Sequence, residues 1–284
     1  VKHVFVHTPT HPVVTDAYPT EIKSDFPVEK AFIDTSIRPF SALGALISGK
    51  NYNLKRFHAT AVEQALVDYL QINSFDTIVL ESLFLAPYIK AIRTVFTGKI
   101  IIRTHNVEHE LWEQQANSAS GIKKWYLRSL ARSLKREELN LLRTADALWT
   151  ITEEDAVRFK ELGIRSPMAI IPVAMETNPQ PANYQSSDFF HLGSMNWAPN
   201  QLAVKRLVSE LWPQLQLDKT KHQLHVAGSF PESMEESADP GIVYHGFVPD
   251  AESFMLQHGV LAAPITTGSG VRIKLLEAMA LGVP

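Results

Sequence analysis

Short apolar runs alternate with longer amphipathic stretches along most of the chain. Apolar runs of this length are typical of strands buried in a parallel sheet, and the stretches between them are typical of crossover helices. In the first half, the pattern predicts strands at 77–80, 99–103 and 147–151 and helices at 61–70 and 122–142. The residues before Phe57 are rich in Pro, Asp, Ser and Thr, and we assign no element there.

The alternation of apolar and amphipathic stretches stops in the polar segment 172–187 and then restarts. This segment contains Pro172, Pro179 and Pro181 and has the composition of a linker. After it, the pattern predicts a helix at 202–211, another from about Val271, and strands at 189–192, 223–227, 243–245 and 260–263.

The order of these elements predicts the fold class and the division into domains. The chain has 284 residues, and domains commonly have roughly 150. We expect an α/β protein of two Rossmann-like domains, both incomplete, whose parallel sheets face each other across a cleft. The expected first domain is 1–175, the linker is 176–186 and the second domain is 187–284.

Composition removes several classes of function. The 27 basic and 30 acidic residues give a formal net charge of -3, which argues against nucleic-acid binding as the main activity. The absence of cysteine excludes a disulfide scaffold, a thiolate zinc site, an iron–sulfur cluster and cysteine catalysis. No apolar run reaches the roughly 18 residues that a membrane-spanning helix needs, and the first residues lack the apolar core of a signal peptide. We therefore expect a cytoplasmic protein.

The strongest candidate for chemistry follows the predicted strand at 260–263. A turn with Gly268 and Gly270 leads into a helix, so backbone N–H groups and the positive end of the helix dipole offer an anion site. Lys274, one turn into the predicted helix, adds a charge for a phosphate, and Glu277 on nearly the same face can accept hydrogen bonds from two vicinal hydroxyls. A diphosphate joined to a ribose satisfies these features. The alternative is a surface turn and helix with Lys274 and Glu277 as a solvated ion pair.

The run 268–284 resembles the donor-site signature of family 4 glycosyltransferases, which have the GT-B fold. The resemblance implies that Glu277 binds the nucleotide ribose, and that Lys274 and the backbone of 269–271 hold the diphosphate. Further matches lie at 191–195 with 199–200, at 244–248, and at 103–109, which resembles a strand-end motif of the acceptor domain. The resemblance implies a glycosyltransferase that retains anomeric configuration, needs no metal or cofactor, and uses a nucleotide-diphosphate sugar as co-substrate with a glycan or lipid-linked acceptor.

The resemblance assigns site residues to both domains. We expect His105, Lys274 and Glu277 to be catalytic, and His105, Asn106 and Glu108 to lie on the acceptor side. Positive charge near the leaving diphosphate would stabilise the charge that develops as the bond breaks. The expected donor-binding residues are Gly193, Ser194, Gly246, Phe247, Gly268, Ser269, Gly270, Val271, Arg272, Lys274 and Glu277.

The sequence departs from the family pattern at the donor site. Many relatives carry a second glutamate at the position of Ser269, so the identity of the sugar is left open. Relatives often place an arginine and a lysine where this chain has Ser194 and Asn200. Two alternatives follow: a non-catalytic sugar-nucleotide-binding protein, which the missing glutamate favours, and a GT-B sugar-nucleotide epimerase. The resemblance also leads us to expect a fragment of a longer protein, truncated at both ends.

His105 has competing interpretations. It lies just after the predicted strand 99–103, where open α/β sheets bind ligands, so we expect it to contact the donor sugar or the acceptor. One alternative is a helix-capping or hydrogen-bonded histidine. Another is zinc, because 105–109 matches the H-x-x-E-H pattern of inverted zinc proteases. Two histidines at that spacing bind one zinc only on a helix, whereas His105 abuts a strand, so we expect no metal.

The predicted helix at 122–142 is amphipathic and basic. The basic face of 122–143 is suited to anionic lipid at the inner face of the cell membrane or to a diphosphate-linked lipid acceptor. The alternative is a solvated outer face whose leucines pack on the sheet. The apolar face is expected to carry Leu127, Leu130, Ala131, Leu134 and Leu141, and the basic face Lys124, Arg128, Arg132, Lys135, Arg136 and Arg143.

Overall fold

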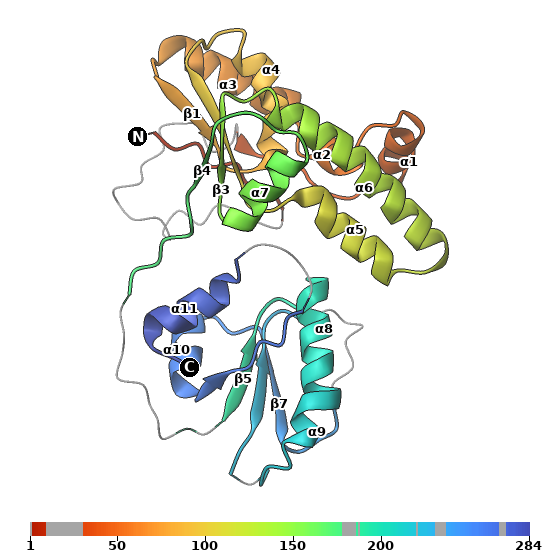
Figure 1. Ribbon diagram of the computed structural model, residues 1–284, viewed down its shortest axis with the longest axis vertical. Coiled ribbons are helices and arrows are strands. Elements are labelled where there is room, and N and C mark those ends of the chain that lie inside the picture. Colours follow the sequence, from red (N-terminus) through yellow and green to blue (C-terminus); the bar gives the residue numbers. More distant parts are fainter. Residues whose placement is uncertain are drawn as a thin grey trace. The chain divides into compact units, whose positions relative to one another are not determined.

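The computed structural model describes residues 2–9, 31–177, 186, 188–219, 221–230, 237–266 and 271–284. The chain divides into two compact units, Val1–Pro172 and Val173–Pro284 (Figure 1). Each unit contains its own parallel sheet with helices packed on it, which is the predicted α/β class with two Rossmann-like parts. Most of the predicted linker at 176–186 lies outside the described residues.

The sheet of the first unit has four parallel strands in the order β1-β2-β3-β4. The register places Ile102 beside Leu148, and both side chains are fully buried. The sequence pattern does not predict β4, a three-residue edge strand in which Ala169 and Ile170 are exposed. The other three strands confirm the predictions. The bounds are β1 Thr77–Leu80, β2 Lys99–Thr104, β3 Ala147–Thr150 and β4 Met168–Ile170.

Helices pack around this sheet. Helices α3 and α6 confirm the predictions at 61–70 and 122–142, and α1 and α2 lie where no element was assigned. Helix α5 is not predicted because its sequence is mostly polar, and only His109 and Ala116 of this helix are buried. The bounds are α1 Pro39–Ile47, α2 Tyr52–Arg56, α3 Thr60–Ile72, η3 Leu83–Tyr88, α4 Ile89–Ile92, α5 Glu108–Ser118, α6 Gly121–Leu142 and α7 Glu153–Glu161.

Helix α6 packs its leucine face into the core of the first unit. The helix ends on fully buried Leu142, whereas Leu141, which the sequence places on the apolar face, is only half-buried. Its buried residues are Leu127, Leu130, Ala131, Leu134, Glu138 and Leu142, and the exposed arginines of this region are Arg128, Arg132, Arg136 and Arg143. Among the described residues, no helix has the length and apolar character needed to cross a membrane.

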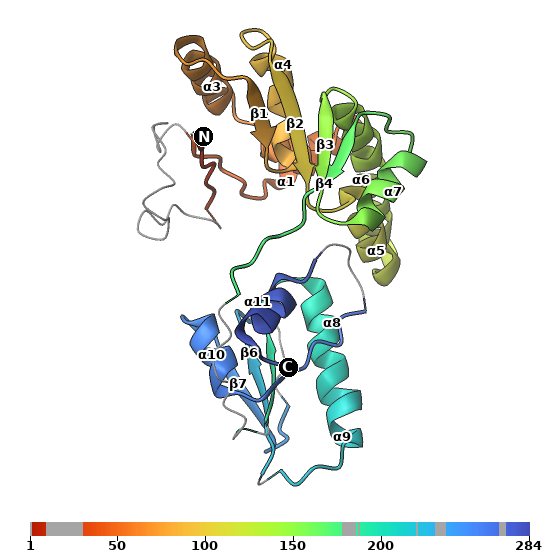
Figure 2. The same ribbon diagram turned by 60° about the vertical axis from the view of Figure 1, so that its left-hand side comes forward.

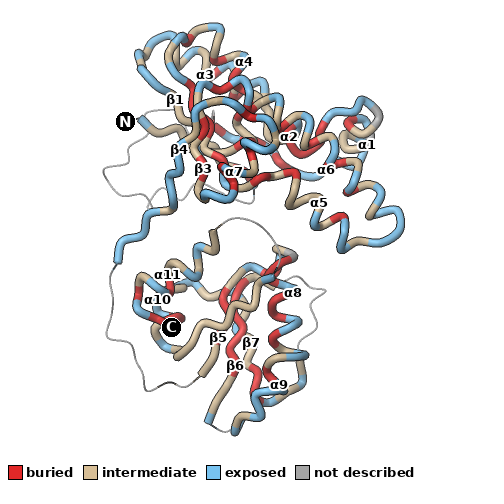
Figure 3. The backbone as a smooth tube through the Cα atoms, viewed as in Figure 1, coloured by how far each residue is buried: buried red, intermediate tan, exposed pale blue. Residues whose placement is uncertain are grey.

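The second unit also has a four-stranded parallel sheet, in the order β7-β6-β5-β8. Helix α8 packs on one face, where it contributes Val204, and α10 and α11 pack on the other, where they contribute Phe254 and Leu281 (Figure 2). Figure 3 shows that the buried residues of this unit gather along the strands and α8. The bounds are β5 Phe189–Leu192, β6 Leu224–Ala227, β7 Ile242–Gly246, β8 Val260–Leu261, α8 Ala198–Arg206, η4 Leu207–Leu211, α9 Trp212–Gln214, α10 Ala251–Gln257 and α11 Ile273–Leu281.

Two helices of the second unit differ from their predicted bounds. The helix predicted at 202–211 begins earlier, at Ala198, and continues through the π-helical turn η4 into α9. Pro213 has no N–H to donate to the turn before it, and a wider turn avoids the clash with its ring. Helix α11 begins at Ile273 rather than near Val271, because Arg272 has extended backbone. Lys274 therefore lies in the first turn of the helix, not one turn into it.

Candidate functional site

Three glycines mark the edge of the second sheet where its parallel strands end. Gly193 follows β5, Gly228 follows β6, and Gly246 closes β7. The N–H of Gly193 donates to the carbonyl of Ala227 (3.0 Å), and the N–H of Gly228 donates to the carbonyl of Gly246 (2.7 Å). Because the carboxyl ends of parallel strands share one edge, two predicted donor-binding residues, Gly193 and Gly246, lie on that edge together.

Only glycine fits where the loops after β5 and β6 meet. Gly228 has φ of 141°, and a Cβ built on it would lie 1.7 Å from the carbonyl oxygen of Gly193. Gly246 has φ of 65°, in the left-handed region that favours glycine. These backbones carry no side chain over the strand ends, so a ligand can approach the edge closely.

Two serine hydroxyls lie beyond the glycines. The Oγ atoms of Ser194 and Ser229 are 2.8 Å apart and exposed, and Asn196 Nδ2 donates to Ser229 Oγ at 3.3 Å. Asn200 is buried and donates through Nδ2 to the carbonyl of Ser194 (2.9 Å), so it fixes the loop. Ser194, a predicted donor residue, thus presents a neutral hydroxyl, and sequence analysis did not identify Ser229 beside it.

Two helix N-termini flank this edge, and neither has a side-chain cap. Helix α8 is preceded by Trp197 and α11 by Arg272, and neither residue caps its helix through a side chain. The Arg272 guanidinium carbon lies 4.9 Å from the centroid of the Trp197 ring, a cation–π contact that joins the two N-termini. Burial lowers the pKa of Arg272, yet a guanidinium stays charged at neutral pH. The N–H groups at a helix N-terminus beside a cation form a setting for an anion.

The two residues predicted to bind the diphosphate and the ribose contact each other. Lys274 Nζ and Glu277 Oε2 lie 2.5 Å apart, three residues apart on α11, with side chains 42% and 29% exposed. This is the solvated ion pair that the alternative interpretation expects, and both groups remain accessible to a ligand. Phe247, directly after β7, is 76% exposed. Val271 is half-buried. The other predicted donor-binding residues of this turn, 268–270, lie outside the described residues.

The first unit gathers polar groups after β1 and β2. Arg103, in β2, donates from Nη1 to Glu81 Oε2 (3.2 Å), and the half-exposed His105 lies with Nε2 3.7 Å from the same oxygen. Glu81 directly follows β1, so neighbouring strand ends bring these groups together. Sequence analysis predicted His105 but not Glu81, although the position of Glu81 after a predicted strand was a usable signal.

Glu108 lies near two other carboxylates of the first unit, Glu138 and Asp155. Its Oε1 accepts a hydrogen bond from Asn106 Nδ2 at 3.3 Å. Burial raises the pKa of Glu108 to about 7, and the charges of Glu138 and Asp155 add to the rise against the hydrogen bond from Asn106. Burial likewise raises the pKa of Asp155. The two predicted acceptor-side residues thus contact each other, and one carries a carboxyl group that exchanges a proton near neutral pH.

The structure contradicts the helix-cap interpretation of His105 and the zinc interpretation of the 105–109 motif. Glu138, fully buried on α6, caps the N-terminus of α5 by accepting from the backbone N–H groups of Glu108 (2.9 Å) and His109 (3.1 Å). His105 is therefore not the helix cap. His109 is fully buried with Nδ1 2.5 Å from Glu138 Oε2, whereas His105 precedes the helix and is half-exposed. The two histidines do not lie on one helix, as a zinc site of this pattern requires.

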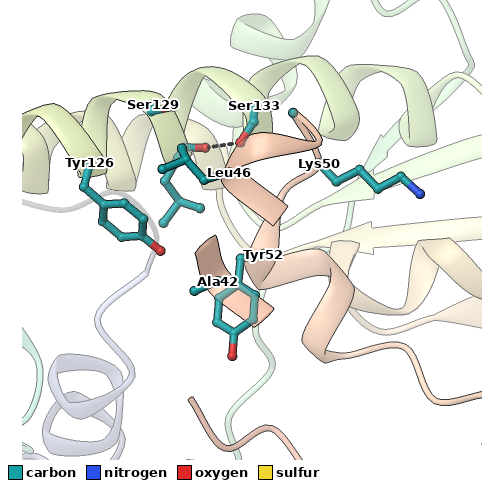
Figure 4. Close-up of a pocket in the computed structure, with 9 residues that line it drawn as sticks. Ala42, Leu46, Lys50, Tyr52, Tyr126, Ser129 and Ser133 are labelled. Atoms are coloured by element: carbon teal, nitrogen blue, oxygen red, sulfur yellow. Dashed lines mark hydrogen bonds between the residues drawn. The ribbon is translucent and has the colours of Figure 1, made fainter. Parts of the chain in front are cut away.

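A small, partly open cavity of the first unit is separate from these residues. It lies between α1 and α6, has a volume of about 30 Å³, and is lined in part by Leu46, Tyr52 and Tyr126 (Figure 4). Ser133 Oγ donates to the carbonyl of Leu130 at its wall (2.9 Å). The cavity holds little more than a water molecule. The predicted site residues do not line it.

Comparison with known proteins places this fold. The chain resembles sucrose-phosphate synthase from Thermosynechococcus elongatus, with 13% identity, a TM-score of 0.61, and coverage of 82% of this chain and 60% of that one. It also resembles a Staphylococcus aureus TarM variant, with 12% identity, a TM-score of 0.57, and coverage of 78% and 44%. The fold is therefore GT-B, as predicted, and the chain spans 60% or less of the length of these structures.

The sequence comparison identifies the family of the second unit. Residues 186–284 match the family described as glycosyl transferases group 1. This match covers the glycine edge and helix α11. No curated protein sequence matches the chain. Residues 186–284 are thus similar to the glycosyl transferases group 1 family, as the resemblance of 268–284 to the donor-site signature implies.

Proposed function

We propose that this chain carries the core of a glycosyltransferase that moves a sugar from a nucleotide-diphosphate donor to a glycan or lipid-linked acceptor. The observation that carries the proposal is the family match over 186–284, which coincides with the uncapped N-terminus of α11. The TarM variant with a similar fold was solved with UDP and alpha-GlcNAc-glycerol, which supports a nucleotide diphosphate as the donor's leaving group.

The donor binds at the carboxyl edge of the second sheet in this proposal. Its diphosphate takes the free N–H groups of α11 and the charges of Arg272 and Lys274, which stabilise the negative charge that develops on the leaving group. Glu277 turns from Lys274 to accept the two ribose hydroxyls. The ion pair between Lys274 and Glu277 holds both side chains on the ligand-facing side of the helix until the nucleotide replaces it.

The acceptor binds the first unit in this proposal. His105 positions the reacting sugar or the acceptor hydroxyl, and Asn106 and Glu108 line the same loop. A carboxyl group with a pKa near 7 is suited to take a proton from an acceptor hydroxyl at neutral pH. The proposal includes retention of anomeric configuration and no metal requirement, both of which follow from the family resemblance.

A thermal-shift screen of nucleotide-diphosphate sugars tests the donor site. We expect at least one of them to stabilise the wild-type protein, and we expect Glu277→Ala to abolish most of that shift because the ribose contact is lost. Glu252→Ala removes an exposed glutamate from α10 of the same unit and serves as the matched control. If no nucleotide sugar stabilises the wild type, or if Glu277→Ala responds as fully as Glu252→Ala, the donor-site assignment is wrong.

A transfer assay separates the proposal from its alternatives. The stabilising donor is incubated with a panel of glycan and lipid-linked acceptors, and both transfer and donor hydrolysis are measured. Binding without either reaction across the panel would identify a non-catalytic binding protein, which Ser269 in place of the family's second glutamate would then explain. A sugar-nucleotide product formed without any acceptor would identify an epimerase.

We propose that the basic side of α6 serves a lipid-linked acceptor. Arg128 and Arg132 are exposed on this helix while its leucines are buried. Such a face attracts anionic headgroups. The double variant Arg128→Glu, Arg132→Glu should cosediment less than the wild type with vesicles that contain anionic lipid. The control variant Arg206→Glu, in the second unit, should cosediment as the wild type does. Equal sedimentation of all three proteins would remove this part of the proposal.

A further inference from the structure

Three histidines gather on one face of the second sheet, and one of them directly precedes the predicted donor-binding residue Gly246. They are His225 on β6, His245 on β7 and His258 just after α10. Each offers one ring nitrogen, and these three atoms all lie within 4.8 Å of one another. His225 is buried, His258 is half-buried and His245 is exposed, so the group opens to solvent on one side.

The pairing of β6 with β7 places His245 on the same face of the sheet as His225. His225 pairs with Val243, and residues two apart on a strand share a face. The register then shifts, pairing Val226 with Tyr244 and Ala227 with Gly246, so His245 is the extra residue of a β-bulge. His245 Nε2 lies 2.8 Å from His225 Nδ1.

Groups behind two of the histidines indicate which ring nitrogen faces the cluster. His258 Nδ1 lies 2.7 Å from the carbonyl of Phe254, which only accepts, so Nδ1 carries the proton and Nε2 keeps a lone pair. His225 Nε2 lies 3.6 Å from Asp188 Oδ2, on the side away from His245. A carbonyl and a carboxylate behind imidazoles are the supporting contacts found around metal-binding histidines.

The three rings pack against one another and against Phe254. The ring of His258 lies 4.1 Å from that of His225, and that of Phe254 lies 4.3 Å from His258, so aromatic contacts hold the cluster in place.

We propose that His225, His245 and His258 bind one zinc-type divalent metal ion, with water in the fourth position on the open side. Tetrahedral zinc with nitrogen ligands at about 2.0 Å needs nitrogens about 3.3 Å apart. The present separations, 2.8 Å for the closest pair and up to 4.8 Å overall, reach that value through small rotations of the rings. The ion replaces the proton between His225 and His245, and that proton moves to the other nitrogen of its own ring, so both imidazoles stay neutral and present a lone pair to the ion. Imidazole suits zinc, nickel and copper.

Zinc titration of the untagged chain tests this site. Isothermal titration calorimetry should give one tight site per chain, and Co²⁺ alone should give the visible absorption of a tetrahedral complex. His245→Ala and His258→Ala should each weaken zinc binding by ~10-fold or more, and Asp188→Asn should weaken it by about 10-fold. His222→Ala, in the loop before β6, is the matched control and should bind as the wild type does.

Circular dichroism of each variant checks that it is folded. His245 is the decisive position because its exposed ring can be removed without opening the core. The proposal is overturned if the wild type binds no zinc. It is also overturned if the folded His245→Ala variant binds zinc as tightly as His222→Ala, since the ion would then sit on other histidines among the 11 in the chain.

Discussion

The proton on Glu108 should make the stability of the first unit depend on pH. In the folded protein the pKa of this carboxyl group is raised from 4.5 to about 7, first by burial and then by the charges of Glu138 and Asp155. Between these two values the folded state holds a proton that the unfolded state releases. Stability therefore falls as pH rises through this window, since the unfolded state binds fewer protons there.

The perturbation is Glu108→Gln, which keeps an oxygen for the hydrogen bond from Asn106 and removes the titration. A pKa rise of about 2.5 units corresponds to about 3 kcal/mol between full protonation and full ionisation, at ~1.4 kcal/mol per unit. The wild type and the variant should have similar free energies of unfolding near pH 4.5, and the variant should be more stable by about 3 kcal/mol near pH 8.

Urea unfolding followed by tryptophan fluorescence and circular dichroism measures both values. Glu154→Gln removes the same charge from an exposed position on α7 and is the matched control. A stability difference between Glu108→Gln and the wild type that is the same at both pH values would refute the reasoning. So would an equal pH-dependent gain in Glu154→Gln, because the effect would then be general charge reduction.

Three further changes should lower the free energy of unfolding in urea. Phe190→Ala removes a fully buried ring from the second sheet and should cost ~3–5 kcal/mol; a loss below ~1 kcal/mol would contradict its core position. Glu138→Ala leaves two backbone N–H groups and an imidazole of α5 without their buried acceptor and should cost about 3–5 kcal/mol, with a smaller loss for Glu138→Gln. Gly228→Ala would place its Cβ 1.7 Å from the Gly193 oxygen and should cost ~3 kcal/mol or more, whereas Gly44→Ala on α1 meets no atom within 4 Å and should be neutral or stabilising.

The tests of stability and of function address different parts of the molecule. Loss of folding in Gly228→Ala would show that the glycine edge is needed to assemble the sheet, while Glu277→Ala leaves the fold intact and removes a proposed ligand contact. A variant that binds no nucleotide therefore counts against the donor site only if its unfolding free energy is unchanged.

Local pattern was sufficient for most strands and for the donor helix. Apolar runs predicted β1 to β3 and the strands of the second sheet, because a strand buried on both faces must be apolar along its length. The helices α5 and α7 were missed because both are polar overall and each buries few residues. The start of α11 was placed two residues early because Arg272 adopts extended backbone, which no local signal marks.

The sequence by itself determined the class of the protein as two parallel α/β parts, and it placed Lys274 and Glu277 on one helix face. Only the tertiary structure decided which distant groups meet. Glu138 caps a helix that begins 30 residues earlier in the chain, Arg272 lies over Trp197, and the pairing of β6 with β7 brings His245 to His225. The physical reason is that periodicity reports which face of an element is buried, whereas contacts between elements depend on register, bulges and packing that are set far away in the sequence.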